Sequence, residues 1–170
     1  MKCNLIFLIL LALLFSCDRP SPTKISFDGR TFELPMRVDK AQKALDLTYG
    51  YYAGFKGSKI SSHYSIITQL EDHPFFPGSD TDSEESYYND YFVGISFFKQ
   101  TETYKIEKNA LEKEYDKKFF PQKDFEYFET NEGLIVVLKS IQKKQYAVCF
   151  YKGIPLDRLS EYLSFVNFRI

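Results

Sequence analysis

An uninterrupted apolar run near the start of the chain limits which residues can form a folded domain. Met1-Lys2-Cys3-Asn4 carries one lysine, and no polar residue follows from Leu5 to Phe15. As a helix this run would rise about 16 Å, roughly half the thickness of a bilayer's hydrocarbon core. A positive segment followed by an apolar stretch too short to span a membrane is typical of a secretory signal peptide. We therefore expect the folded protein to come from the residues after this run.

The apolar run ends in Leu14-Phe15-Ser16-Cys17, with a small residue directly before a cysteine. These residues resemble the lipobox of bacterial lipoproteins. The resemblance implies that the Cys17 thiol carries diacylglycerol, that the chain is cleaved after Ser16, and that the new amine is acylated, for example with palmitate. Phe15 is bulkier than the residue usual at its position in the motif. The alternative is a secreted protein, uncleaved or conventionally cleaved, in which Cys17 is an ordinary thiol.

Lipid on Cys17 would hold the mature chain on a membrane of the bacterial cell envelope. Two or three acyl chains hold a protein firmly where a single chain binds only marginally. Residues 18–23 are polar and include Pro20 and Pro22, which favour an extended tether. We expect a signal peptide over 1–16, a tether over 17–23 and a single domain over 24–170, anchored at the inner membrane, the outer membrane or the cell surface.

Size and charge narrow the class of protein. The mature chain would have 154 residues (170 minus 16), enough for one domain with a sizeable core. Its net charge would be -2, because the whole chain carries -1 and the only charged side chain lost is Lys2. This balance indicates no basic surface, so we expect no nucleic-acid partner. With Cys3 removed and Cys17 carrying lipid, Cys149 has no cysteine left for an intramolecular disulfide.

Aromatic residues indicate a β-rich core rather than an aromatic surface for a ligand, because they favour pleated, half-buried positions. The chain has 13 Tyr and 17 Phe but no Trp. Residues 24–27 and 30–34 alternate apolar and polar side chains around Asp28-Gly29, which predicts a hairpin that ends at Pro35. The spacing of Asp39-Lys40-Ala41-Gln42 is that of a capping box and predicts a helix over about 39–50.

Residues 60–70 and 91–98 are predicted strands, the second of them central because it is apolar on both faces. Its expected faces are Tyr91, Val93, Ile95 and Phe97 on one side, and Phe92, Gly94, Ser96 and Phe98 on the other. An amphipathic helix is predicted within 102–119. Its expected apolar stripe is Ile106, Ala110, Leu111, Tyr115 and Phe119.

Residues 125–129, 134–139 and 145–151 are predicted to form three consecutive antiparallel strands joined by short polar turns. Pro155 suits the first turn of a closing helix. That helix has an expected apolar face of Leu156, Leu159, Leu163 and Val166, and a short strand over 167–170 would follow it.

The predicted fold class is α+β, with a mostly antiparallel sheet of about six to seven strands covered by two to three helices. This order of elements, with Phe32-Glu33-Leu34-Pro35 near the start and Leu163-Ser164-Phe165 in the closing helix, resembles PsbP/Mog1-like α/β/α domains. The resemblance covers most of the mature chain. It implies a binding or assembly role and assigns no catalytic residues.

The long acidic segment over 72–90 is the candidate interaction loop. Its candidate residues are Asp80, Asp82, Glu84, Glu85, Tyr87 and Tyr88. The alternating acids suit a hard cation, but the EF-hand pattern fails because Glu85 stands where the turn glycine belongs and Tyr91 where the bidentate acid belongs. We expect a solvated loop and no bound metal.

Catalytic chemistry has few candidates in this chain. His63, His73 and Cys149 are the histidines and the free thiol of the mature chain, too few for a convincing zinc site. No nucleophile elbow, phosphate-binding loop, dinucleotide fingerprint or metalloprotease motif is present, and no cofactor is expected. We expect Cys149 to be a packing residue, and the charged pairs Glu107-Lys108 and Glu112/Asp116 to lie on an exposed helix face.

Two functions remain open. The first is a non-enzymatic envelope lipoprotein that binds a protein or another envelope component through its sheet edge or its acidic loop. Envelope assembly and periplasmic immunity against a toxin are forms of this role. The second is a lipid-anchored envelope hydrolase that uses His63 or Cys149.

Overall fold

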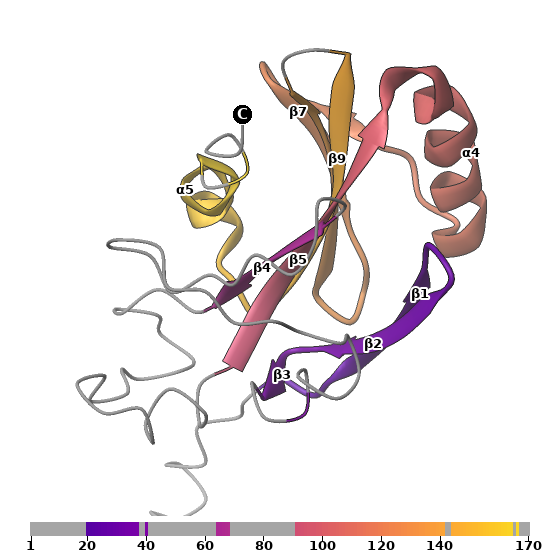
Figure 1. The fold of residues 1–170 in the computed structure, drawn as a ribbon. Helices are drawn as coiled ribbons and strands as arrows, with labels where there is room; N and C mark the ends of the chain where they lie inside the picture. The colour runs from indigo at the N-terminus through magenta and orange to yellow at the C-terminus, as the bar shows by residue number, and fades with distance from the viewer. Residues whose placement is uncertain are drawn as a thin grey trace, which may run out of the picture.

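The computed structural model describes residues 20–37, 40, 64–68, 91–141, 144–164 and 166 (Figure 1). Cys17 with the signal peptide, the acidic loop and both histidines lie outside the described residues. So do the strand expected at the very end of the chain and the helix expected over 39–50, apart from residue 40.

The predicted hairpin is confirmed. Strands β1 (Thr23–Phe27) and β2 (Arg30–Leu34) pair antiparallel around a two-residue turn. Asp28 and Gly29 have φ values of 53° and 72°. Positive φ at both central residues is the requirement of a type I′ turn, the connection that Asp-Gly favours.

Among the described residues, seven strands form one antiparallel sheet and the β1–β2 hairpin forms a second. The order of the larger sheet is β3-β5-β9-β8-β7-β6, and β4 also pairs with β5. The predicted meander is confirmed as β7, β8 and β9. The strands are β3 (Met36–Arg37), β4 (Tyr64–Thr68), β5 (Tyr91–Gln100), β6 (Phe120–Pro121), β7 (Phe125–Glu129), β8 (Leu134–Ile141) and β9 (Gln145–Lys152).

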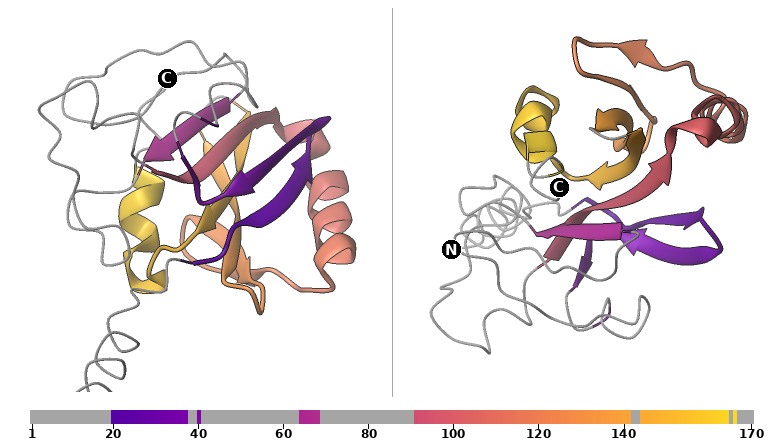
Figure 2. Two further views of the ribbon diagram at one scale, coloured as in Figure 1. Left: turned by 90° about the horizontal axis from the view of Figure 1, so that it is seen from below. Right: turned by 45° about the horizontal axis from the view of Figure 1, so that its top comes forward.

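Helices cover both sides of the larger sheet, which confirms the predicted α+β class (Figure 2). Helix α4 (Tyr104–Tyr115) follows the short 3-10 helix η1 (Thr101–Thr103) and packs on one side together with the β1–β2 hairpin. Helix α5 (Leu159–Ser164) follows η2 (Leu156–Arg158) and packs on the other side.

The core is divided in two by the sheet. Along β8, successive side chains alternate between the two halves, and both halves are buried. The α4-side core is Ile25, Phe27, Phe32, Leu34, Met36, Phe92, Ile95, Phe97, Leu111, Phe119, Phe128, Leu134, Val136, Leu138, Tyr146, Val148 and Phe150. The α5-side core is Val93, Ile135, Val137, Ala147, Cys149, Tyr151, Ile154, Leu159, Tyr162, Leu163 and Val166.

Helix α4 turns a different face to the sheet than its apolar residues predict. Leu111 is buried, and Tyr104 and Tyr115 pack against the α4-side core. At about 100° per residue these three project in nearly one direction, while Ile106 lies about 200° from Tyr104. Ile106 is 73% exposed and Ala110 is also exposed. The predicted stripe is therefore wrong at these two positions, because two tyrosines define the buried face.

Strand β5 is central, as predicted, but it contains a β-bulge that changes its faces. Ile67 and Thr68 are neighbours in β4, yet they pair with Gly94 and Phe92, which leaves Val93 as an extra residue. Phe92 belongs to the α4-side core and Val93 to the α5-side core. The predicted alternation holds from Gly94 onward and is wrong before it.

The closing helix is confirmed with one correction. Leu159, Leu163 and Val166 are buried as predicted, but Leu156 is exposed. This segment begins with a 3-10 turn, in which the Arg158 N–H donates to the Pro155 carbonyl oxygen at 3.1 Å. Because a 3-10 turn is wound more tightly than an α-helix, the spacing that predicted Leu156 on the buried face does not apply there.

Candidate functional site

Two rows of cross-strand neighbours run over the α5 side of the sheet. Directly paired residues share a face, so each row is a continuous strip of side chains. The Cys149 row is Ser96, Cys149, Val137, Tyr127 and Phe120. The Lys139 row is Phe98, Ala147, Lys139 and Phe125.

Cys149 is fully buried beneath α5 and packs in the α5-side core. Burial raises the pKa of its thiol to about 11, although the neighbouring Ser96 and Tyr151 hydroxyls act in the opposite direction. The thiol is therefore protonated at neutral pH, whereas a nucleophilic cysteine must be a thiolate that substrate can reach. The expected packing role of Cys149 is confirmed, and the hydrolase hypothesis is left with His63, which lies outside the described residues.

The buried hydroxyls near Cys149 form no conventional network. Neither Ser96 Oγ nor Tyr151 Oη makes a hydrogen bond of normal geometry with a described residue, although both influence the titration of Cys149. The Tyr151 ring lies over Gly94, its cross-strand partner. This arrangement fills the space between the sheet and α5.

The other part of this side of the sheet is only partly covered. Phe98, Phe125 and Tyr127 are half-buried against the edge of the α5-side core, and Phe120 is 64% exposed. The Tyr127 ring centroid lies 6.4 Å from that of Phe120 and 6.0 Å from that of Phe125. We call these four residues the aromatic strip.

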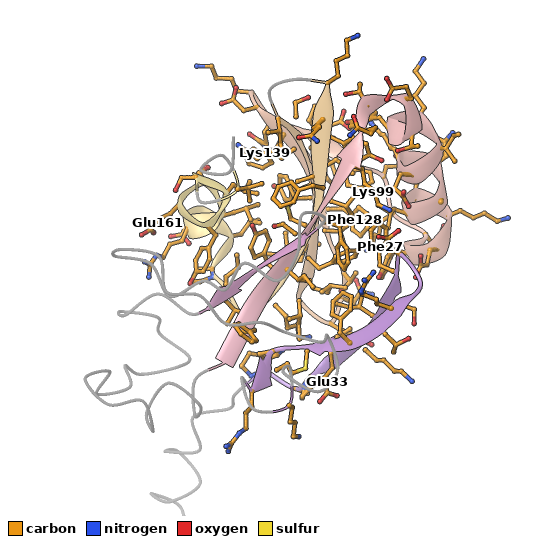
Figure 3. All side chains as sticks on the ribbon, in the orientation of Figure 1. Phe27, Glu33, Lys99, Phe128, Lys139 and Glu161 are labelled. Atoms are coloured by element: carbon orange, nitrogen blue, oxygen red, sulfur yellow. The ribbon has the colours of Figure 1, made fainter. Side chains whose placement is uncertain are left out.

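Lys139 lies within the aromatic strip, between Ala147 and Phe125 in its row. Figure 3 shows it on the side of the sheet where α5 packs. The residue is only 7% exposed, and it forms no hydrogen bond or ion pair with any other described residue. The Nζ is not fully enclosed, so the ammonium group reaches solvent within the strip, where an external negative group can approach it.

β6, the strand at the edge of the sheet beside the aromatic strip, limits how another chain could bind. β6 has two residues, and one of them, Pro121, offers no backbone N–H. Short strands and prolines protect sheet edges against pairing with another strand. The edge therefore favours contact through side chains over strand addition.

Few features of the sequence predict the aromatic strip. Phe119 and Phe120 are neighbours, yet the first is buried beside Phe128 and the second is exposed beside Tyr127. The doubled phenylalanine before Pro121 could have indicated a short edge strand. Lys139 stood in a predicted strand, with no pattern to show which strand neighbours would surround it.

Two charged residues predicted to lie on an exposed face, Lys108 and Glu112, are half-buried and form ion pairs, which corrects their predicted role. Asp116 is exposed, as predicted. The Lys108 Nζ and the Tyr104 hydroxyl both donate to Glu126 Oε2, each at 2.7 Å. Glu112 accepts from the Lys118 Nζ at 3.0 Å and from the Phe119 N–H at 3.3 Å. The first two contacts hold α4 against β7, and the other two hold the residues after α4 against the helix, so all of them serve the fold.

The described residues contain no group of three or more histidine, cysteine or acidic side chains placed to hold a metal ion. Within the same residues, no helix has the length and apolar character needed to cross a bilayer. The candidate loop residues Asp80, Asp82, Glu84, Glu85, Tyr87 and Tyr88 lie outside the described part of the chain.

Comparison with known proteins finds no relative. No protein-family model matches the chain, and no curated protein or solved structure matches it.

Proposed function

We propose that this chain is a lipid-anchored protein of the bacterial cell envelope whose domain binds a protein partner and catalyses no reaction. The apolar run over 5–15 and the Ser16-Cys17 step support the anchor, with diacylglycerol on Cys17. Envelope assembly and immunity against a periplasmic toxin are both roles of this kind.

The observation that carries the binding role is the exposure of Phe120 beside the half-buried ring of Tyr127, which in turn adjoins the half-buried ring of Phe125. Aromatic side chains near the centre of an interface contribute much of its affinity once a partner covers them. Lys139 adds a cation at the same surface, with which a carboxylate of the partner would pair. The partner is therefore expected to present an apolar side chain next to an acidic one.

Recovery of a partner from solubilised envelopes tests this proposal, with the full-length protein as bait. Phe120→Ser should lower recovery of a stoichiometric partner about tenfold or more, because loss of a central aromatic costs about 2 kcal/mol. Ile106→Ser is the matched control, since Ile106 is also a large, exposed apolar residue but lies on α4, across the sheet. It should leave recovery unchanged.

Lys139→Met separates charge from packing, because methionine retains an apolar stem and loses the ammonium group. It should weaken recovery without lowering thermal stability. Equal recovery with wild type, Phe120→Ser and Lys139→Met would rule out the aromatic strip as the binding surface. Turnover of an envelope substrate by the purified protein would contradict a purely binding role.

A further inference from the structure

The first strand of the fold begins at one end of the larger sheet. Thr23, the first residue of β1, donates its hydroxyl to Glu132 Oε2 at 3.2 Å. Glu132 lies in the turn between β7 and β8, which is closed by a hydrogen bond from the Gly133 N–H to the Thr130 carbonyl oxygen at 2.9 Å. The almost fully buried Lys152 donates to the Glu132 carbonyl oxygen. Thr23 therefore lies beside a turn that several hydrogen bonds stabilise.

The end of α4 reaches the same place. Lys117, just after the helix, donates to Asn131 Oδ1 of this turn at 3.4 Å. The Tyr115 ring packs 5.5 Å from that of Phe128, near the end of β7. A shallow depression of about 380 Å³ beside this point is lined by Asn109, Glu112, Lys113, Asp116, Lys117 and Lys118. The turn, the start of β1 and the end of α4 thus form one surface, the β7–β8 end.

The opposite end of the sheet lies about 23 Å away, the length of β8. It contains Gln100 and Gln145, which pair at the ends of β5 and β9. There the Thr101 N–H donates to the Lys144 carbonyl oxygen at 2.9 Å. The sheet therefore has two well-separated ends, and only one of them adjoins Thr23.

We infer that the β7–β8 end faces the headgroup layer of the membrane that holds the chain, an inference that rests on the proposed lipid on Cys17. The backbone between Cys17 and Thr23 spans at most about 20 Å when fully extended. If the strands stood upright with the opposite end against the bilayer, Thr23 would lie about 23 Å from the membrane surface. A tether of this length cannot span that distance. The aromatic strip then lies on a side wall, open to a partner in the envelope.

Charged residues of both signs lie at the β7–β8 end, so its contact with a headgroup layer does not require an anionic lipid. The lysines that line the depression lie close to Glu112 and Asp116, and Lys118 is paired with Glu112. Near-balanced charge gives little long-range attraction. The tether, rather than electrostatic binding, therefore sets the orientation.

Energy transfer from a single tryptophan tests the orientation, because the natural chain has no Trp. Asn131→Trp marks the β7–β8 end and Gln100→Trp the opposite end, both at exposed positions. The lipoprotein purified from cells is placed in phosphatidylcholine vesicles that contain a dansyl-labelled headgroup lipid. Transfer from Trp at position 131 should be several-fold greater than from Trp at position 100. Equal transfer, or greater transfer from position 100, would overturn the inference.

A second preparation separates this inference from the proposed anchor. A chain that begins at Cys17 is coupled through that thiol to a maleimide lipid, which reproduces the tether whether or not cells attach lipid. Buried Cys149 should not compete for the reagent. If cells do not lipidate Cys17, the proposed anchor fails, and the coupled chain still reports which end faces the bilayer.

Discussion

Among single residues, Gly94 has very little room for a side chain. A Cβ atom at this position would overlap the ring of Tyr151, its partner across β5 and β9. The Tyr151 ring is fully buried in the α5-side core, where it also packs against Tyr162 at 6.0 Å between ring centroids. The ring therefore cannot move aside without disturbing α5, and the close approach requires glycine.

Gly94→Ala should destabilise the protein by about 1–3 kcal/mol, the usual cost of overpacking a core. Urea unfolding measures the change. Tyr151→Leu removes the overlapping ring, so the double variant Gly94→Ala/Tyr151→Leu should be more stable than the sum of the two single losses predicts. Strictly additive losses would show that the overlap with the ring is not the cause.

At the scale of elements, Glu126 on β7 and Glu107 on α4 should respond oppositely to pH. Burial alone would raise the pKa of Glu126, but hydrogen bonds from Lys108 and Tyr104 outweigh it and hold the pKa below its ordinary value. Burial raises the pKa of Glu107, with Lys99 opposing this effect and Asp28 adding to it. Ionised Glu126 therefore stabilises the fold, and ionised Glu107 costs stability.

Glu126→Gln should lower the free energy of unfolding at neutral pH by up to about 1 kcal/mol, because this partly exposed contact is screened by solvent. The loss should shrink as the pH falls through the lowered pKa of Glu126, where the wild-type carboxylate is protonated as well. Glu107→Gln is the control with the opposite sign and should be neutral or slightly stabilising at neutral pH. Unfolding curves at several pH values measure both, and equal, pH-independent losses would contradict this account of α4.

The elements that could be predicted from the sequence are those fixed by local chemistry. Asp28-Gly29 requires only its own turn, and the meander requires only short polar connections between alternating strands. The bulge at Val93 could not be predicted, because it depends on the pairing of β5 with β4. The exposure of Phe120 likewise depends on where α5 stops covering the sheet. The local sequence around Phe120 carries no information about the position of that distant helix.

For the whole molecule, the layered fold determines which surfaces remain accessible. The sheet lies between α5 on one side and α4 with the hairpin on the other, so neither of its broad faces is freely open (Figure 2). Among the described residues, the aromatic strip and the two ends of the sheet stay accessible. In the proposed arrangement the β7–β8 end faces the membrane and the strip faces the partner, so anchoring and binding do not compete for the same surface.

The mass of the mature amino terminus, measured after labelling cells with a fatty acid, tests the central claim most directly. The wild-type chain should begin at Cys17 and carry diacylglycerol with labelled acyl groups. Cys17→Ser should remain an unlabelled, full-length precursor, because only a thiol can form the thioether. A wild-type chain that begins at another residue, or label that persists in Cys17→Ser, would contradict the lipid anchor.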